Sequence, residues 1–283
     1  MKQVGSLRYG VIFKKAFSHP EIFTSFIRDV LGIELEISSV ETEKSFSPPV
    51  GPIDSRFDLF AEDVKNRVIV DIQHQRLKDH YDKFLHYHCV ALLEQAARSS
   101  TYRSDVRVFT VVVLTSGDRH KTDVAMIDFD PRDRTGRPLG EIHHKIIYLC
   151  PKYVADDTPE PVREWLLAID DTLDEEVDET LYRPEISSIF DYIEKSCISP
   201  RDAAEMKEEA AREEKLKELE EELKSVKADL RNKEDSLQAA KVEERKEIAR
   251  TMLNNGLSIE QVANCTQLSA EQITALHKGF SKK

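Results

Sequence analysis

Residues 56–75, RFDLFAEDVKNRVIVDIQHQ, contain two short runs with the composition of β-strands. The first run is RFDLFA, the second is RVIVDIQ, and turn-forming residues separate them, so the stretch predicts a β-hairpin. Asp71 lies within the apolar part of the second run. An unpaired carboxylate is costly in such a buried position. The stretch therefore raises the question of what stabilises Asp71.

The segments on either side of the hairpin predict a mixed sheet with helices packed on it. Before it, an apolar stripe at helical spacing ends at Gly32. The stripe comprises Ile22, Phe23, Phe26, Ile27, Val30 and Leu31. After the hairpin, residues 79–97 again have helical spacing, residues 106–116 are typical of a fully buried strand, and residues 144–149 form a further short strand. We therefore expect an α/β or α+β domain over residues 1–155.

The composition excludes several classes of protein. With 40% hydrophobic and 33% charged residues, the chain has the composition of an ordinary soluble protein. Its four cysteines are widely spaced, which suggests neither a disulfide framework nor a zinc ribbon. The longest strongly apolar run, residues 108–114, is too short to cross a bilayer, and the first ten residues lack the apolar core of a signal peptide. We expect a cytoplasmic protein that does not associate with membranes.

The net charge of −12 is distributed unevenly along the chain. Residues 1–155 hold 22 Lys and Arg against 21 Asp and Glu, whereas residues 156–200 hold 3 against 14. Such an acidic segment is repelled by the phosphate backbone, so we expect any DNA-binding surface in the first or last third of the chain. We interpret residues 156–200 as an acidic helical linker.

A leucine pattern follows Pro200, in a charged and strongly helix-forming segment. Its apolar positions alternate in spacings of three and four residues, with a lysine interrupting them: Leu216, Leu219, Leu223, Val226, Leu230, Lys233 and Leu237. This seam predicts a coiled-coil helix over residues 201–245 and a homodimer, with a lone amphipathic helix as the alternative.

The last forty residues contain two similar heptapeptides, LSIEQVA and LSAEQIT. Each carries the capping-box pattern, which pairs Ser258 with Gln261 and Ser269 with Gln272. Two short helices therefore begin here, and the preceding helix KEIARTMLNNG completes a unit of helix-turn-helix type over residues 246–283. Such a unit either binds DNA or serves as an interaction module.

Strand alternation suggests that acidic side chains of the hairpin form a site. Asp71 and Gln73 share one face of the second strand, and Asp58 and Asp71 converge near one end of the hairpin if the register permits. Two neighbouring carboxylates require a compensating cation, and Mg²⁺ (or Mn²⁺) suits such a site. Basic residues that could hold a DNA backbone bracket the hairpin: Arg56, Arg67, Arg76 and Lys78. Alternatively, Asp71 lies on a solvated edge or pairs with an arginine such as Arg67 or Arg76.

Several blocks together resemble a known family. The blocks are FKKAF, FDLFAED, VDIQHQ, DKFLHYH and VFTVVVLTS, followed by the C-terminal stretch KEIARTMLNNGLSIEQVANCTQLSAEQI. In this order they resemble the family of recombination-promoting nucleases and transposase-related proteins, within the PD-(D/E)XK nuclease superfamily. The resemblance covers residues 8–155 and 243–276, and it rests on the order of the blocks more than on any single motif.

The resemblance implies a restriction-endonuclease-like fold and Mg²⁺-dependent cleavage of DNA in recombination or transposition. By position, Asp58 and Asp71 look like the acidic metal ligands. Ile72 would offer its backbone carbonyl to the metal, and Gln73 would orient the attacking water in the place where lysine is usual.

The chain departs from the family pattern at three positions. Asp71 stands where glutamate is more common, and Gln73 carries no charge to stabilise the transition state, although glutamine is common in this family. Gly10 replaces a frequent acidic residue, for which Glu21 is the candidate substitute. These departures keep two alternatives open, namely a catalytically degenerate DNA-binding or interaction protein and a purely structural dimer.

Overall fold

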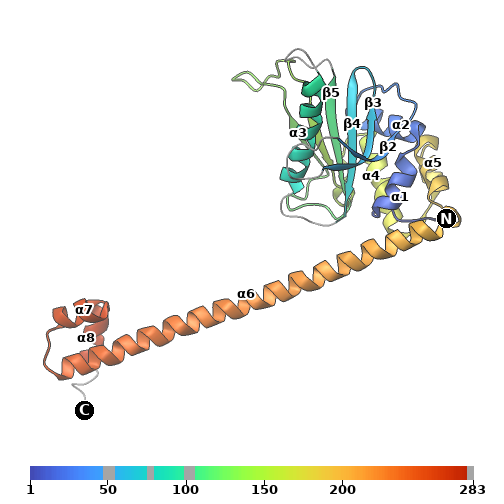
Figure 1. Ribbon diagram of the computed structural model, residues 1–283. Coiled ribbons are helices and arrows are strands. Elements are labelled where there is room, and N and C mark those ends of the chain that lie inside the picture. The colour runs from blue at the N-terminus through green and yellow to red at the C-terminus, as the bar shows by residue number, and fades with distance from the viewer. Residues whose placement is uncertain (47–54, 75–79, 99–105, 279–283) are drawn as a thin grey trace. The chain divides into compact units, whose positions relative to one another are not determined.

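The computed structural model describes residues 1–46, 55–74, 80–98 and 106–278 (Figure 1). The chain divides into two compact units, Met1–Ala211 and Arg212–Lys283. Among the helices in the described ranges, none combines the length and the apolar character needed to span a bilayer.

The first unit is built on a six-stranded mixed sheet, as the sequence predicts. In spatial order its strands are β2 (Glu41–Ser45), β3 (Arg56–Glu62), β4 (Asn66–Gln73), β5 (Arg107–Leu114), β7 (Lys145–Leu149) and β6 (Val124–Asp128). β2, β3 and β4 are antiparallel neighbours, and β3 and β4 form the predicted hairpin. β4, β5 and β7 run parallel, and β6 pairs antiparallel with β7. The parallel core therefore has one common carboxyl edge, where β4 ends at Gln73.

Helices cover both faces of this sheet (Figure 1). One face packs against α3 (His80–Arg98). The opposite face packs against α1 (Gly10–Phe17), α2 (Pro20–Leu31), α4 (Val162–Asp171) and α5 (Pro184–Tyr192). α2 ends where Gly32 adopts the left-handed conformation, with φ of 67°, as the sequence predicts.

Short elements complete this unit. β1 (Lys2–Gln3) pairs antiparallel with β8 (Glu176–Val177). Among the described residues, 3₁₀ turns connect the larger elements: η1 (Pro151–Tyr153), η2 (Thr172–Asp174), η3 (Glu179–Leu181) and η4 (Lys195–Cys197).

Strand alternation decides which side chains of β4 face α3. Val68 and Val70 belong to the core cluster of α1 and α2, whereas Ile69 packs with Ala91 of α3. Asp71 continues the alternation of Ile69, and Gln73 follows two residues later. Both polar residues therefore lie on the α3 face, near the carboxyl edge of the sheet.

The acidic segment 156–200 differs from the expected linker. Its helices α4 and α5 contribute Trp165, Leu166, Ile169, Ile186 and Phe190 to the same core cluster as α1 and α2. Both helices are amphipathic, because apolar residues recur at helical spacing between the acidic ones. The segment is therefore part of the first unit, because the apolar faces of its two helices are buried in the core of that unit.

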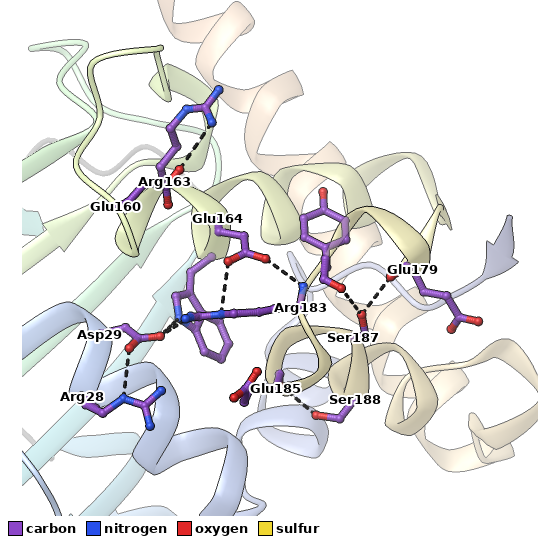
Figure 2. Close-up of polar contacts among 12 residues, drawn as sticks. Arg28, Asp29, Glu160, Arg163, Glu164, Glu179, Arg183, Glu185, Ser187 and Ser188 are labelled. Carbon is purple, nitrogen blue, oxygen red and sulfur yellow. Dashed lines mark hydrogen bonds and ion pairs between the residues drawn. The ribbon is translucent and has the colours of Figure 1, made fainter.

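A polar network also joins this segment to α2 (Figure 2). The carboxylate of Asp29 accepts a hydrogen bond from the indole of Trp165 at 2.8 Å and forms an ion pair with Arg183. Arg183 in turn pairs with Glu164 of α4 at 3.1 Å. Burial alone would raise the pKa of Asp29, but the bonds from Trp165 and Arg183 hold it below its ordinary value. Asp29 thus fixes α4 and α5 on α2.

The second unit consists mainly of helix. α6 (Pro200–Asn254) is continuous across the expected boundary at residue 245, and its first turns belong to the first unit. α7 (Ile259–Thr266) and α8 (Ala270–Lys278) follow, and their core comprises Ala249, Val262, Leu268 and Ile273. Both predicted capping boxes are present, with Ser258 bonded to Gln261 and Ser269 to Gln272 in both directions.

The apolar positions of the heptad pattern lie on the surface of α6. The side chains of Leu216, Leu219, Leu223, Val226, Leu230 and Leu237 are all exposed. The predicted helix is thus confirmed, and the coiled-coil dimer stays a prediction.

Candidate active site

Asp58 and Asp71 meet where the backbone ladder between β3 and β4 stops. The strands pair Leu59 with Val70 and Phe60 with Ile69, and this register places Asp58 opposite Asp71. Here side chains take the place of ladder bonds. Oδ2 of Asp58 accepts a hydrogen bond from the Ile72 amide at 3.0 Å, and Oδ1 of Asp71 accepts one from the Asp58 amide at 3.3 Å. The structure therefore brings the two predicted carboxylates together.

The strand irregularity at this point changes one expectation about β3. Alternation predicts that Phe57 lies on the face of Leu59, whereas Phe57 packs with Phe60 on the α3 side. In the neighbouring strand, Glu43 has a φ of 54° and lies opposite Asp58 in the register. A non-glycine residue in this conformation marks a local break in strand geometry. The break explains why simple alternation fails at Phe57.

Burial makes the carboxylate pair costly without a proton or a cation. Asp71 is only 3% exposed, and its Oδ2 atom has no hydrogen-bond partner among the described residues. Burial, followed by the negative charge of Asp58, raises the pKa of Asp71 well above its ordinary value. Burial likewise raises the pKa of Asp58. Both shifts favour the protonated carboxyl groups, so a divalent cation that binds here would compete with protons.

Charged side chains from three elements act on this pair. Lys14 of α1 and Lys83 of α3 lower the pKa of Asp58, and Glu43 of β2 raises it. Lys14 forms an ion pair with Glu43, which also lies 3.7 Å from Arg56. Neither Glu43 nor Lys83 was predicted as a site residue, because neither lies within the hairpin sequence.

Gln73 lies one alternation beyond Asp71 and is 8% exposed. Its Oε1 atom accepts a hydrogen bond from the ammonium group of Lys83 at 3.3 Å. One signal for Lys83 was present in the sequence, since it lies beside Phe84 and four residues before Tyr87 on the apolar stripe of α3. A charge on such a stripe requires an explanation.

Ile72 and Glu21 differ in how they relate to the pair. Ile72 lies between Asp71 and Gln73 in β4, so its backbone is adjacent to both carboxylates. Glu21, in the first turn of α2, accepts a hydrogen bond from Tyr192 of α5 and lies 4.0 Å from His19. The structure therefore does not bring Glu21 to the pair.

The basic residues proposed for DNA contact have different environments. Arg56 has an exposed side chain, as a DNA contact requires. The expectation that Arg67 contacts DNA is corrected by its burial. Its side chain is 3% exposed and forms ion pairs with Glu62 and, at 2.7 Å, with Glu94. Its guanidinium also donates to the Ala91 carbonyl, so it joins β4 to α3 and is not available to phosphate. Arg76 and Lys78 lie outside the described residues.

The donor set fits a hard divalent cation that keeps several water ligands. No group of three or more His, Cys, Asp and Glu side chains suited to a metal occurs among the residues with described positions. Mg²⁺ is commonly held by one or two carboxylates, with water and substrate phosphate as further ligands. Asp58 and Asp71 supply two carboxylates, and the partnerless Oδ2 of Asp71 supplies an oxygen that needs a cation or a proton.

The second unit has the helical arrangement of a helix-turn-helix, and comparison with known families agrees. Residues 242–278 match the Rpn/YhgA-like nuclease family, C-terminal HTH domain. The matched range comprises the end of α6 together with α7 and α8. Comparisons with curated proteins and with solved structures give no match.

The Rpn/YhgA-like match supports part of the resemblance seen in the sequence. It supports the nuclease family through the C-terminal unit and suggests that this unit binds DNA. Assignment of the first unit to the PD-(D/E)XK superfamily stays a prediction, which rests on the order of the sequence blocks.

Proposed function

We propose that the chain is a metal-dependent DNA endonuclease that hydrolyses phosphodiester bonds in recombination or transposition. The observation that carries this proposal is the buried pair of Asp58 and Asp71, in which Oδ2 of Asp71 has no partner within the described residues. The C-terminal match to the Rpn/YhgA-like nuclease family supports DNA as the substrate.

In this proposal the site residues of the hairpin divide the catalytic work. Asp58 and Asp71 hold Mg²⁺, or Mn²⁺ in its place, and Ile72 adds its backbone carbonyl. The bound cation would supply charge neutralisation at the phosphate and a more acidic water. Gln73 orients the attacking water. Arg56 holds the DNA backbone, and Arg76 and Lys78 are further candidates for that contact.

We also propose that the protein acts as a cytoplasmic homodimer. The exposed apolar positions of α6 follow a heptad pattern, and a second copy of α6 would cover them. A dimer would carry two helix-turn-helix units, the usual arrangement for binding two DNA half-sites.

The alternative is a catalytically degenerate DNA-binding protein of the same fold. Two observations favour it: the described residues bring together only two carboxylates suited to a metal, and the family match lies in the C-terminal unit. In that case DNA binding persists without cleavage, and the pair of aspartates binds no metal.

Relaxation of supercoiled plasmid distinguishes the two functions. The assay compares the wild type with Asp58→Asn and Asp71→Asn, each with Mg²⁺, with Mn²⁺ and with EDTA. Asparagine keeps the side-chain oxygen that accepts the backbone hydrogen bond, so these variants remove charge with little change in shape. Asp63→Asn is a matched control, because Asp63 lies in the turn of the same hairpin and bonds to the amides of Lys65 and Asn66.

The nuclease proposal expects metal-dependent cutting by the wild type and by the Asp63 variant, and a loss of at least about 100-fold in the two site variants. DNA binding, measured separately by fluorescence anisotropy, should persist in all four proteins. Absence of cutting in every protein, with DNA binding retained and no Mn²⁺ bound by the wild type, would establish the alternative.

A further inference from the structure

Positively charged side chains from outside the hairpin also lie near the carboxylate pair. Gln73 is neutral, yet negative charge develops on the phosphate oxygens during hydrolysis, and a fixed positive charge nearby lowers the barrier. Among the basic residues on the described elements, two lysines act on the carboxylate pair, Lys14 and Lys83. Their surroundings differ.

Lys14 is already neutralised by a partner. Its ammonium group forms an ion pair with Glu43, and its charge lowers the pKa of Asp58. Lys83, in contrast, forms no ion pair with a carboxylate in the part of the chain that the structure describes. Its charge lowers the pKa of both Asp58 and Asp71. Lys83 is therefore the lysine whose charge is free to act on a bound anion.

The position of the Lys83 ammonium is fixed by its neighbours. It donates to Oε1 of Gln73 at 3.3 Å. It also lies 4.6 Å from the centre of the Phe84 ring and 5.4 Å from that of Tyr87, at cation–π distances. Phe84 is fully buried and packs with Val112 and Tyr148 of the sheet, so the ring that supports the ammonium belongs to the core. Such support holds the charge in place before substrate binds.

We infer that Lys83 is a catalytic residue that binds a non-bridging oxygen of the scissile phosphate and holds the Gln73 amide in one orientation. This inference rests on the proposed endonuclease function. Lys83 then supplies from α3 the positive charge that a lysine at position 73 would supply from β4.

The hydrolytic step does not require Lys83 to change its protonation state. A bond forms between the water oxygen and phosphorus as the bond from phosphorus to the leaving oxygen breaks. The attacking water loses a proton to solvent, and the leaving oxygen gains one. Lys83 stays charged throughout and compensates the negative charge on the non-bridging oxygen.

The test moves the lysine between the two elements. Wild type, Lys83→Gln, Gln73→Lys and the double variant Gln73→Lys/Lys83→Gln are compared in the plasmid assay. Lys145→Gln is the matched control, because Lys145 is a half-buried lysine at the amino end of β7, away from the carboxyl edge where Gln73 lies. Mn²⁺ affinity by titration calorimetry and the thermal unfolding midpoint are measured for every protein.

The inference expects the Lys83→Gln variant to cut about 100-fold more slowly than the wild type. It should bind Mn²⁺ as tightly as the wild type or more tightly, because a repelling cation has been removed from the carboxylates. The double variant should regain at least about 10-fold of the lost rate, since it restores a lysine charge beside the pair. Lys145→Gln should behave as wild type.

Two results would overturn the inference alone: cutting by Lys83→Gln at the wild-type rate, or a lowered unfolding midpoint with weaker Mn²⁺ binding and no recovery in the double variant. The second result would show a structural role. If the wild type itself binds Mn²⁺ but does not cut, the proposed function falls, and this inference falls with it.

Discussion

The side chains of Asp58 and Asp71 each accept a hydrogen bond from the backbone of the opposite strand. Asp58 accepts from the Ile72 amide at 3.0 Å, and Asp71 accepts from the Asp58 amide at 3.3 Å. These bonds replace the ladder at the end of the hairpin and hold two carboxylates close together in a buried place. Like charges in such a place are stable only with a proton or a cation. In the proposed function, this backbone geometry would hold both carboxylates in place before a cation binds.

The first prediction concerns the stability of the metal-free protein. Burial and the charge of Asp58 raise the pKa of Asp71 above its unfolded value, so the folded state binds more protons than the unfolded state. The contribution of protonated Asp71 to stability is complete at low pH and is lost as the pH rises through its folded pKa. Asp71→Asn should therefore raise the free energy of unfolding in EDTA by about 2 kcal/mol at pH above neutrality, and by less in acid.

Asp63→Asn is the control with the opposite sign. Burial favours a raised pKa at Asp63, but the amides of Lys65, Glu36 and Asn66 lower it below its ordinary value. The resulting stability is present above the unfolded pKa and is lost as the pH falls. Asp63→Asn should lower the unfolding midpoint near neutral pH. If circular dichroism shows that Asp71→Asn lowers it as well, the interpretation of the buried pair is wrong.

The second prediction is that metal binding releases protons. Because the pKa of Asp58 and that of Asp71 are both raised, a divalent cation must displace protons from the pair. Mn²⁺ affinity should therefore continue to increase as the pH rises above the ordinary range of aspartate. Calorimetry in two buffers with different ionisation enthalpies measures the released protons directly. Affinity that does not change with pH would contradict this prediction.

The third prediction separates two arginines that the sequence places in one group. Arg67 joins Glu62, Glu94 and the Ala91 carbonyl inside the first unit. Arg67→Met removes the buried guanidinium and its ion pairs with Glu62 and Glu94, and it should reduce the free energy of unfolding by about 3 kcal/mol. Arg56→Gln, on the exposed side of β3, should leave stability unchanged.

DNA affinity provides the second half of this comparison. Arg56→Gln should weaken DNA binding and make its salt dependence less steep, because one phosphate contact is lost. Arg67→Met, assayed well below its unfolding midpoint, should bind DNA as the wild type does. Anisotropy titrations at several salt concentrations test both. A flatter salt dependence for Arg67→Met would show that this residue reaches phosphate after all.

The fourth prediction concerns the apolar face of α6. Leu230→Lys places a charge within the heptad seam, whereas Ala228→Lys adds the same charge two residues away, on the opposite side of the helix. Leu230→Lys should weaken the dimer by at least about 10-fold, and Ala228→Lys should not. Sedimentation equilibrium measures the molar mass of each. A monomeric wild type would exclude the homodimer.

Local patterns in the sequence predicted six elements of the first unit, namely α2, β3, β4, α3, β5 and β7. The hairpin, the buried strand β5 and the helix α2 follow from alternation, apolar runs and a terminal glycine, which are properties of neighbouring residues. The edge strand β2, with its sequence ETEKS, escaped prediction because it has no apolar alternation. Its pairing with β3 gives it strand structure.

The acidic segment shows where charge obscured a second pattern. Fourteen acidic residues led to the expectation of a linker, although Trp165, Ile169 and Phe190 have the spacing of buried helix faces. The aromatic partners of Trp165, Phe17 and Phe26, lie more than a hundred residues earlier in the chain. The segment was expected to be a helical linker, and only the packing shows that its helices cover the sheet.

The sequence by itself determined the hairpin, the convergence of Asp58 with Asp71 and both capping boxes, because each depends on residues within about fifteen positions of one another. The tertiary structure decided that Lys83 contacts Gln73, that Glu43 lies opposite Asp58 and that Arg67 is buried. These relations depend on how α3 and β2 pack on the hairpin. Their physical cause is the joint burial of apolar surface by elements distant in the chain, which no local pattern encodes.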